Sequence, residues 1–85
     1  MVSTFKGGAV PRYFFDLEGH DQFKDDEGTD LADDNAARVE AAVFAGSYLK
    51  DHPELLWNGH EIRVVVRDEA GSIVLTLVTL AVDGR

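Results

Sequence analysis

One alanine-rich helical pattern, flanked on each side by a pair of strand-like segments, constrains the fold of this chain more than any other feature. Residues 34–50 contain no proline. An apolar stripe recurs along them at the helical spacing i, i+4, i+7, i+8 and i+11: Ala37, Ala41, Phe44, Ala45 and Tyr48. Asp33 or Asp34 is a good N-cap, and Pro53 ends the helix. A single helix of this kind can cover one face of a small sheet.

Two strand-like segments precede the helix. Residues 11–17 alternate, with Tyr13, Phe15 and Leu17 on one face and Arg12, Phe14 and Asp16 on the other. A turn follows, and residues 22–25 are predicted to return as a short second strand with Phe23 facing inward. Residues 25–34 are then expected to form a polar loop in which Leu31 is the apolar anchor.

Two further segments follow a connection over residues 51–59. Residues 61–68 alternate, with Ile62, Val64 and Val66 predicted inward and Arg63, Val65 and Arg67 outward. Gly71 lies where a tight hairpin turn requires positive φ, and residues 73–82 form the longest predicted strand, apolar on both faces.

The order ββαββ predicts a single two-layer α+β domain over residues 10–85. It consists of an antiparallel four-stranded sheet, in the order 2-1-3-4, with one helix packed on one face. Residues 1–9, with Gly7-Gly8 and small polar neighbours, are expected to be a flexible leader.

The acidic residues are concentrated in one segment. The net charge is −8, and residues 16–34 hold nine acids against Lys24 alone, whereas the rest of the chain is balanced. A nucleic acid or an anionic membrane would meet a repulsive surface, so neither is expected as a partner. Charge runs of this kind are more often a solvated face than a ligand site.

Several classes of protein are disfavoured by what the sequence lacks. With no cysteine, disulfides, thiolate metal sites and a cysteine nucleophile are excluded. The first residues lack the apolar segment of a secretory signal, and no run of 18 apolar residues is present. We therefore expect a cytoplasmic protein.

Four short motifs resemble a known family. They are Arg12-Tyr13-Phe14-Phe15-Asp16, Asp26-Glu27-Gly28, Ala36-Ala37-Arg38 followed by Glu40-Ala41, and Val66-Arg67-Asp68-Glu69-Ala70-Gly71. In this order they resemble a family of small bacterial domains of unknown function, found mostly in alphaproteobacteria. The resemblance covers about residues 11–80 and implies a stand-alone cytoplasmic protein. It implies no activity, cofactor or catalytic residue.

None of the motifs that carry known chemistry is complete. With Gly28 at the sixth position of a calcium loop, Phe23 occupies the first ligand position, and Asp34 occupies the twelfth, where glutamate is expected. The histidines, His20, His52 and His60, show no metal-binding spacing, and no serine lies in a G-x-S-x-G turn. We assign no catalytic, cofactor-binding or metal-ligating residue and expect no cofactor.

The apolar residues exceed what one helix and one sheet can cover. Val65, Phe14 and part of residues 73–82 should lie on the uncovered side, and Val39 and Val43 form a second stripe on the helix. We therefore predict a non-enzymatic protein that acts through self-association as a homodimer, with the uncovered sheet face or residues 73–82 in the contact.

Two other classes of function stay open. A strand hairpin, an acidic turn and an alanine-rich helix are similar to HicB-like antitoxins, so the protein could be a regulator whose acidic segment meets a basic protein partner. The carboxylates could instead serve a ligand- or metal-binding domain. The sequence leaves the role of Trp57 undecided between capping the core and standing exposed.

Overall fold

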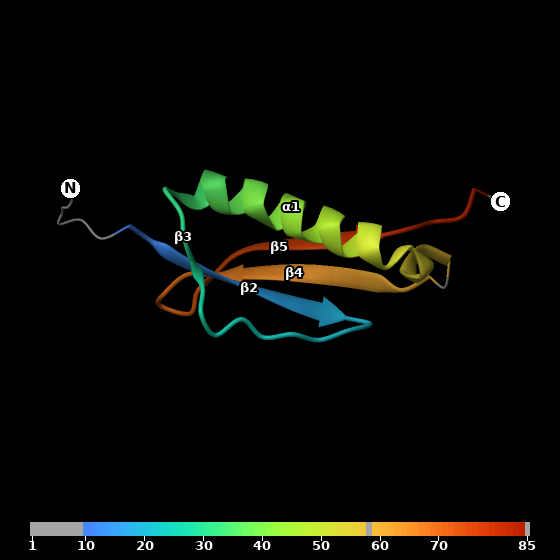
Figure 1. The fold of residues 1–85 in the computed structure, drawn as a ribbon, viewed down its shortest axis with the longest axis horizontal. Helices are drawn as coiled ribbons and strands as arrows, with labels where there is room; N and C mark the ends of the chain where they lie inside the picture. Colours follow the sequence, from blue (N-terminus) through green and yellow to red (C-terminus); the bar gives the residue numbers. More distant parts are fainter. Residues whose placement is uncertain (1–9, 58, 85) are drawn as a thin grey trace.

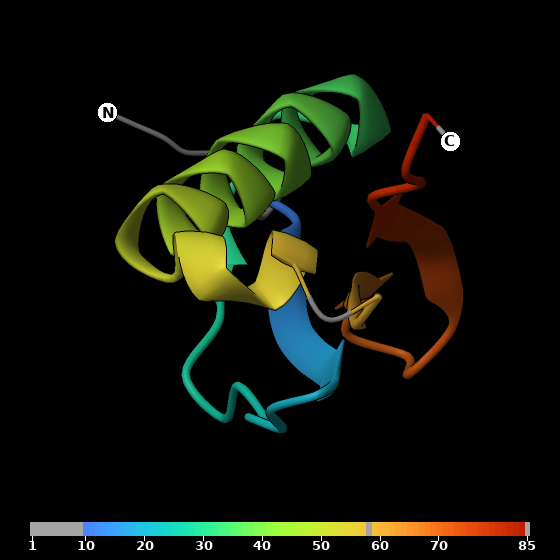
Figure 2. The same ribbon diagram turned by 90° about the vertical axis from the view of Figure 1, so that its right-hand side faces the viewer.

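A computed structural model describes residues 10–57 and 59–84, so the expected leader over residues 1–9 lies outside the described residues. The elements are β2 (Arg12–Gly19), β3 (Thr29–Asp30), α1 (Asp34–Asp51), the 3₁₀ helix η1 (Pro53–Trp57), β4 (Glu61–Arg67) and β5 (Ile73–Leu80). The four strands form one antiparallel sheet in the order β3-β2-β4-β5, and α1 packs on one face of it (Figures 1 and 2). The predicted α+β fold and its strand order are confirmed.

Helix α1 begins and ends where the sequence predicts. The Asp33 carboxylate accepts a hydrogen bond from the Ala36 N–H at 2.9 Å, so Asp33 is the N-cap. The helix ends at Asp51, and His52 is the C-cap, just before Pro53. The alanines of the predicted stripe, Ala37, Ala41 and Ala45, are buried. Because these side chains are small, the helix backbone approaches the sheet closely, and Phe44 and Tyr48 pack against the edge of the core.

The core lies between α1 and the two central strands. Tyr13, Phe15 and Leu17 of β2 and Ile62, Val64 and Val66 of β4 point toward the helix and are buried, as their alternation predicts. Leu55 of η1 closes one end of this core, in a segment that the sequence left as an unstructured connection. None of the described helices is long and apolar enough to cross a bilayer.

The second strand lies later in the chain than the sequence predicted. Residues 22–25 form no strand, and Phe23 makes one isolated bridge with Leu17 and is 57% exposed, so the prediction that it faces inward is wrong. On the side of β2 away from β4, the paired strand is β3, which lies within the predicted polar loop. Between the Leu17–Phe23 bridge and β3, the Asp25 carboxylate accepts hydrogen bonds from the N–H groups of Glu27 and Gly28. This turn takes the place of the backbone hydrogen bonds that a continuous second strand would make with β2.

The face of the sheet opposite α1 is more polar at its centre than the sequence predicted. Val65, expected among the exposed apolar residues, is 7% exposed. It lies between Arg63 and Arg67 on the same face of β4, and these arginines form ion pairs with Glu18 and Asp16 on β2. Long arginine side chains carry apolar stems that shield neighbouring residues while their charged groups are paired. On this face of the sheet, the large exposed apolar side chains are therefore those of β5.

Candidate functional site

A polar network joins β2, β4 and the acidic segment on the face opposite α1. The Arg67 guanidinium donates from Nε to Asp16 Oδ2 at 2.7 Å and from Nη2 to Asp16 Oδ1 at 3.1 Å, which is a bidentate ion pair. The same Nη2 donates to the Asp25 carbonyl at 3.1 Å, and the Asp25 N–H donates to Asp16 Oδ1 at 3.0 Å. The Asp16 side chain is 8% exposed. These bonds fix the acidic segment onto the sheet.

The two carboxylates of this network are held in their charged form. The hydrogen bonds from Arg67 lower the pKa of Asp16 and outweigh the opposing effect of burial. For Asp25, the largest single effect on the pKa is burial, which raises it. The hydrogen bonds from the N–H groups of Gly28, Phe15 and Glu27 together outweigh burial and bring the pKa below its usual value. A carboxylate with a lowered pKa is a poor general acid or base near neutral pH. Both carboxylates of the network are therefore ionised near neutral pH and act as hydrogen-bond acceptors there.

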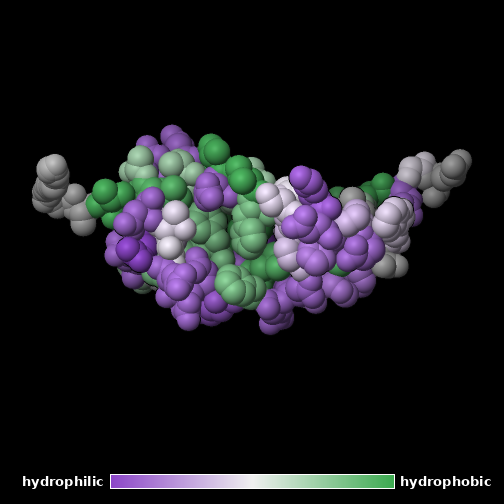
Figure 3. Space-filling model, in the orientation of Figure 1, coloured by the Kyte–Doolittle hydropathy of each residue, from purple (hydrophilic) through white to green (hydrophobic). Residues whose placement is uncertain are grey.

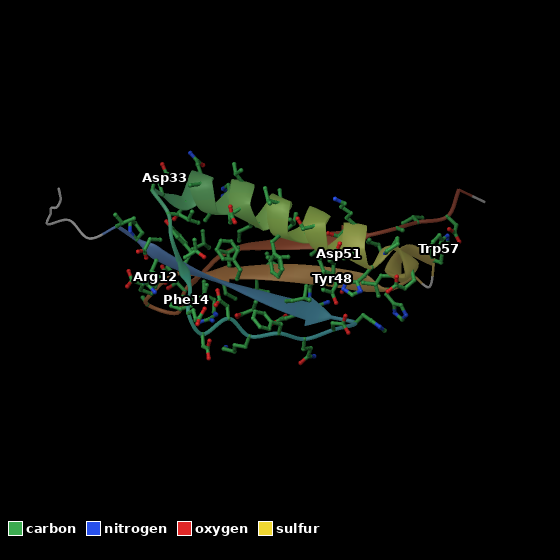
Figure 4. All side chains as sticks on the ribbon, viewed as in Figure 1. Arg12, Phe14, Asp33, Tyr48, Asp51 and Trp57 are labelled. Atoms are coloured by element: carbon green, nitrogen blue, oxygen red, sulfur yellow. The ribbon has the colours of Figure 1, made fainter. Side chains whose placement is uncertain are left out.

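Residues that carry the family resemblance have structural roles around this network. Gly28 has a φ of +78°, and a Cβ at this position would lie 2.8 Å from Arg12 Cγ and 2.9 Å from Phe14 Cε2. Figure 4 shows Arg12 and Phe14 close together on β2. The Arg67 guanidinium lies 5.1 Å from the centre of the Phe14 ring, a cation–π contact that leaves Phe14 half-buried on the face where the sequence placed it.

The hairpin between β4 and β5 is fixed by two further residues of the same motifs. Asp68 Oδ1 accepts hydrogen bonds from the N–H groups of Ala70 and Ser72, and Gly71 has the predicted positive φ, of +86°. The carboxylate of Glu69 accepts a hydrogen bond from the Arg12 N–H at 3.3 Å and so ties the hairpin to the start of β2. These motifs therefore specify turns and ion pairs of the fold.

Most of the acidic segment is used within the molecule. The carboxylates of seven of its nine acids accept a hydrogen bond or form an ion pair within the molecule: Asp16, Glu18, Asp21, Asp25, Asp30, Asp33 and Asp34. Two of them bind tyrosines. The hydrogen bond to Asp34 raises the pKa of Tyr13 to about 12, and the hydrogen bond to Asp21 raises that of Tyr48 to about 12. The segment is thus more ordered than a solvated charge run.

The three histidines lie at one end of the molecule, where their rings make two separate contacts. The rings of His20 and His60 lie 4.2 Å apart, and the His52 ring lies 4.4 Å from that of Tyr48. Within residues 10–57 and 59–84, no group of three or more histidine, aspartate or glutamate side chains is arranged to hold a metal ion. Trp57, at the same end, is 75% exposed and does not cap the core (Figure 4).

The two edges of the sheet differ sharply. At one edge β3 has two residues, and the Asp25 carboxylate accepts the Phe15 N–H at 3.1 Å where a longer strand would have paired. At the other edge β5 has eight residues, no charge and no proline, and no strand pairs with its outer side among the described residues. Natural proteins protect edges with short strands, charges or bulges. The β5 edge is neither short nor charged, and its register shift lies near its start, where Val66 pairs with Leu75 and Arg67 with Ile73.

The exposed apolar residues of the sheet lie on this same strand. Ile73, Val78 and Leu80 are 65%, 50% and 56% exposed on the face opposite α1, and Leu75 and Leu77 are partly exposed on the helix side. An edge that is open in its backbone and apolar on both faces is suited to pairing with another strand. The sequence pointed to this strand through its two apolar faces.

The ion-pair network was not predicted from the sequence. Asp16 and Arg67 were placed on the outward faces of their strands, but their pairing depends on the register that sets Phe14 opposite Arg67 and Asp16 opposite Val65. An acid and a base at outward positions of two strands were the available signal. Without the register between the two strands, other pairings were equally consistent with it.

Comparison with known proteins gives one match. The model of a family described as "Domain of unknown function (DUF6894)" matches residues 12–81. No curated protein and no solved structure matches the chain. The match spans β2 through β5 together with the motifs described above.

Proposed function

Because the chain belongs to the DUF6894 family, whose members share a domain of unknown function, we propose its role from its surface: it is a non-enzymatic protein that works as a homodimer paired along β5. The observation that carries this proposal is the open edge of β5, which is long, uncharged and apolar on both faces. The other edge is short and closed by Asp25, so a partner strand has one suitable place to add.

A second copy of the chain fits this edge better than an unrelated strand does. In an antiparallel pair related by a two-fold axis, each β5 meets an identical sequence, and with no charge in Ile73–Leu80 there is no like-charge repulsion in any register. An eight-residue antiparallel pair makes about eight backbone hydrogen bonds. The pair would also bury Val78 against the partner strand on one face and the leucines beneath the helices on the other.

Light scattering after size-exclusion chromatography tests the proposal. At micromolar concentration we expect a mass of twice the 9.3 kDa chain. The variant Val78→Lys places a charge in the contact and should be monomeric, whereas Val39→Lys, at a comparably exposed position on α1, should remain dimeric. Both variants replace an exposed side chain, so both should keep the wild-type circular dichroism spectrum.

Hydrogen exchange gives an independent measure. Alternate amides on the outer side of β5 should exchange more slowly as protein concentration rises, because the partner strand protects them. A single-chain mass at micromolar concentration, or a Val78→Lys variant as dimeric as the wild type, would overturn the proposal.

A further inference from the structure

A groove lies on the side of the molecule away from β5, between α1 and the segment 20–30. Its volume is about 380 Å³, and its lining comes from both walls: Phe15, Phe23, Asp25, Thr29, Glu40, Val43, Phe44 and Ser47. Figure 3 views the molecule from this side and shows apolar side chains between the helix and the segment, with hydrophilic residues around them. Figure 2 shows the segment and β5 on opposite sides of the molecule.

The groove exists because the chain leaves β2 between Phe23 and β3. Over this stretch no strand backbone covers the edge of β2, and the Asp25 carboxylate accepts the Phe15 N–H in its place. The apolar residues of the two walls are therefore left facing solvent: Phe23 is 57% exposed and Val43 is 55% exposed. Pockets for small ligands are usually enclosed, whereas this one is an open depression at the lower limit of their size. A depression of this kind suits a few side chains of a peptide.

The charge around the groove selects the kind of peptide. Asp25 and Glu40 line it, and it borders the segment of residues 16–34, where nine acids face one lysine. Arginines of neighbouring strands pair with three of those acids, Asp16, Glu18 and Asp30, which reduces the net charge of the region but leaves it negative. A negative surface attracts basic partners and repels acidic ones, and it accelerates their encounter at low salt.

We infer that this groove binds a basic peptide segment of a protein partner, with an aromatic or aliphatic anchor seated against Phe23, Val43 and Phe44 and flanking lysines or arginines facing the acidic segment. Helix α1 supplies one wall and the segment 20–30 supplies the other, so the anchor lies between the helix and a segment that the Asp16–Arg67 network ties to the sheet. The site is separate from β5, and a β5 dimer would present two such grooves.

Fluorescence anisotropy with a defined probe tests the inference. The probe is a labelled synthetic peptide, Lys-Lys-Phe-Ala-Ala-Leu-Lys-Lys, and the controls are the same peptide with glutamate in place of lysine and with alanine in place of both anchors. We expect binding of the basic anchored peptide alone, with an affinity that falls as salt is added. Equal binding of the acidic peptide would overturn the inference.

Matched variants locate the site. Val43→Ser removes an apolar wall and should weaken binding at least about fivefold, because the anchor loses buried apolar contact. Val39→Ser removes the same side chain from the same helix outside the groove lining and should leave binding unchanged. Glu40→Gln should weaken binding and reduce its salt dependence, whereas Asp51→Asn at the end of the helix should not.

Two results would contradict the binding of a partner peptide in this groove. If the peptide binds only after residues 1–9 are deleted, the chain's own N-terminal segment occupies the groove and the inference fails. If Val43→Ser and Val39→Ser weaken binding equally, the peptide contacts the acidic surface without using the groove, and the inference also fails. Because Val78→Lys lies on β5, this variant should bind the peptide as the wild type does, whatever its oligomeric state.

Discussion

The substitution Asp16→Asn should destabilise the fold more than the loss of a surface charge can explain. Asparagine has nearly the same size and can still accept the Asp25 N–H, but its amide cannot form the bidentate ion pair with Arg67. Removal of one partner of a buried pair costs about 3–5 kcal/mol. Since the Arg67 side chain is 20% exposed, water solvates part of the unpaired guanidinium, and we expect the lower end, about 3 kcal/mol.

Urea unfolding followed by circular dichroism measures this loss as a lower midpoint at unchanged slope. The helix signal is a better probe than the fluorescence of Trp57, which is already 75% exposed in the folded state. Asp26→Asn, at an exposed position of the same acidic segment, is the matched control and should change stability by less than about 0.5 kcal/mol. All variants are compared at one protein concentration, because dimerisation would add to the apparent stability.

A double-mutant cycle isolates the pair. In Asp16→Asn/Arg67→Met no charge is left unpaired at the site, so the double variant should be less destabilised than the sum of the two single variants. An Asp16→Asn variant as stable as Asp26→Asn, or additive effects in the cycle, would refute the reasoning that the ion pair anchors the acidic segment.

Single residues elsewhere in the fold support three more predictions. Gly28→Ala forces an alanine into positive φ against neighbouring side chains and should cost about 1–3 kcal/mol in urea unfolding, whereas Gly46→Ala, with open space around it in α1, should stabilise by about 1 kcal/mol. In an ultraviolet titration neither Tyr13 nor Tyr48 should ionise at the usual pKa of about 10, because both pKa values are raised to about 12, and ionisation near pH 10 in the folded protein would contradict their bonds to aspartates. The lowered pKa of Asp16 contributes stability that is complete above its unfolded pKa of about 3.9 and is lost as the pH falls through the folded value. The urea midpoint should therefore drop in acid, with a shallower dependence on pH in Asp16→Asn.

Local sequence patterns predicted the helix ends and the inward-facing strand residues correctly, because these features depend on residue types at fixed spacings along the chain. The alanine stripe of α1 is the face that is buried, and Asp33 and Pro53 mark the two ends of the helix through capping and the lack of a backbone N–H. The alternation in β2 and β4 assigned the inward residues correctly, since a one-residue shift would have exposed all of them.

Local patterns gave a wrong prediction where a side chain competes with the backbone for hydrogen bonds to N–H groups. The pattern of residues 22–25 predicts a returning strand, but the Asp25 carboxylate bonds to nearby N–H groups and to Phe15, which displaces the strand to Thr29–Asp30. The exposure of Phe23 and the groove beside it follow from that displacement. The local sequence does not show that Asp25, and not one of the acids beside it, accepts these hydrogen bonds.

The sequence by itself determined the ββαββ order, the helix boundaries and the residues of β2, β4 and α1 that face the core, because these depend on periods of 2 and 3.6 residues and on capping chemistry close along the chain. Only the tertiary structure decided that Asp16 meets Arg67, that most acids of the segment have intramolecular partners, and that exposed apolar surface lies on β5 and in the groove beside α1. Those features arise from pairs of residues as far as 51 positions apart, whose contact depends on strand register and not on any local pattern.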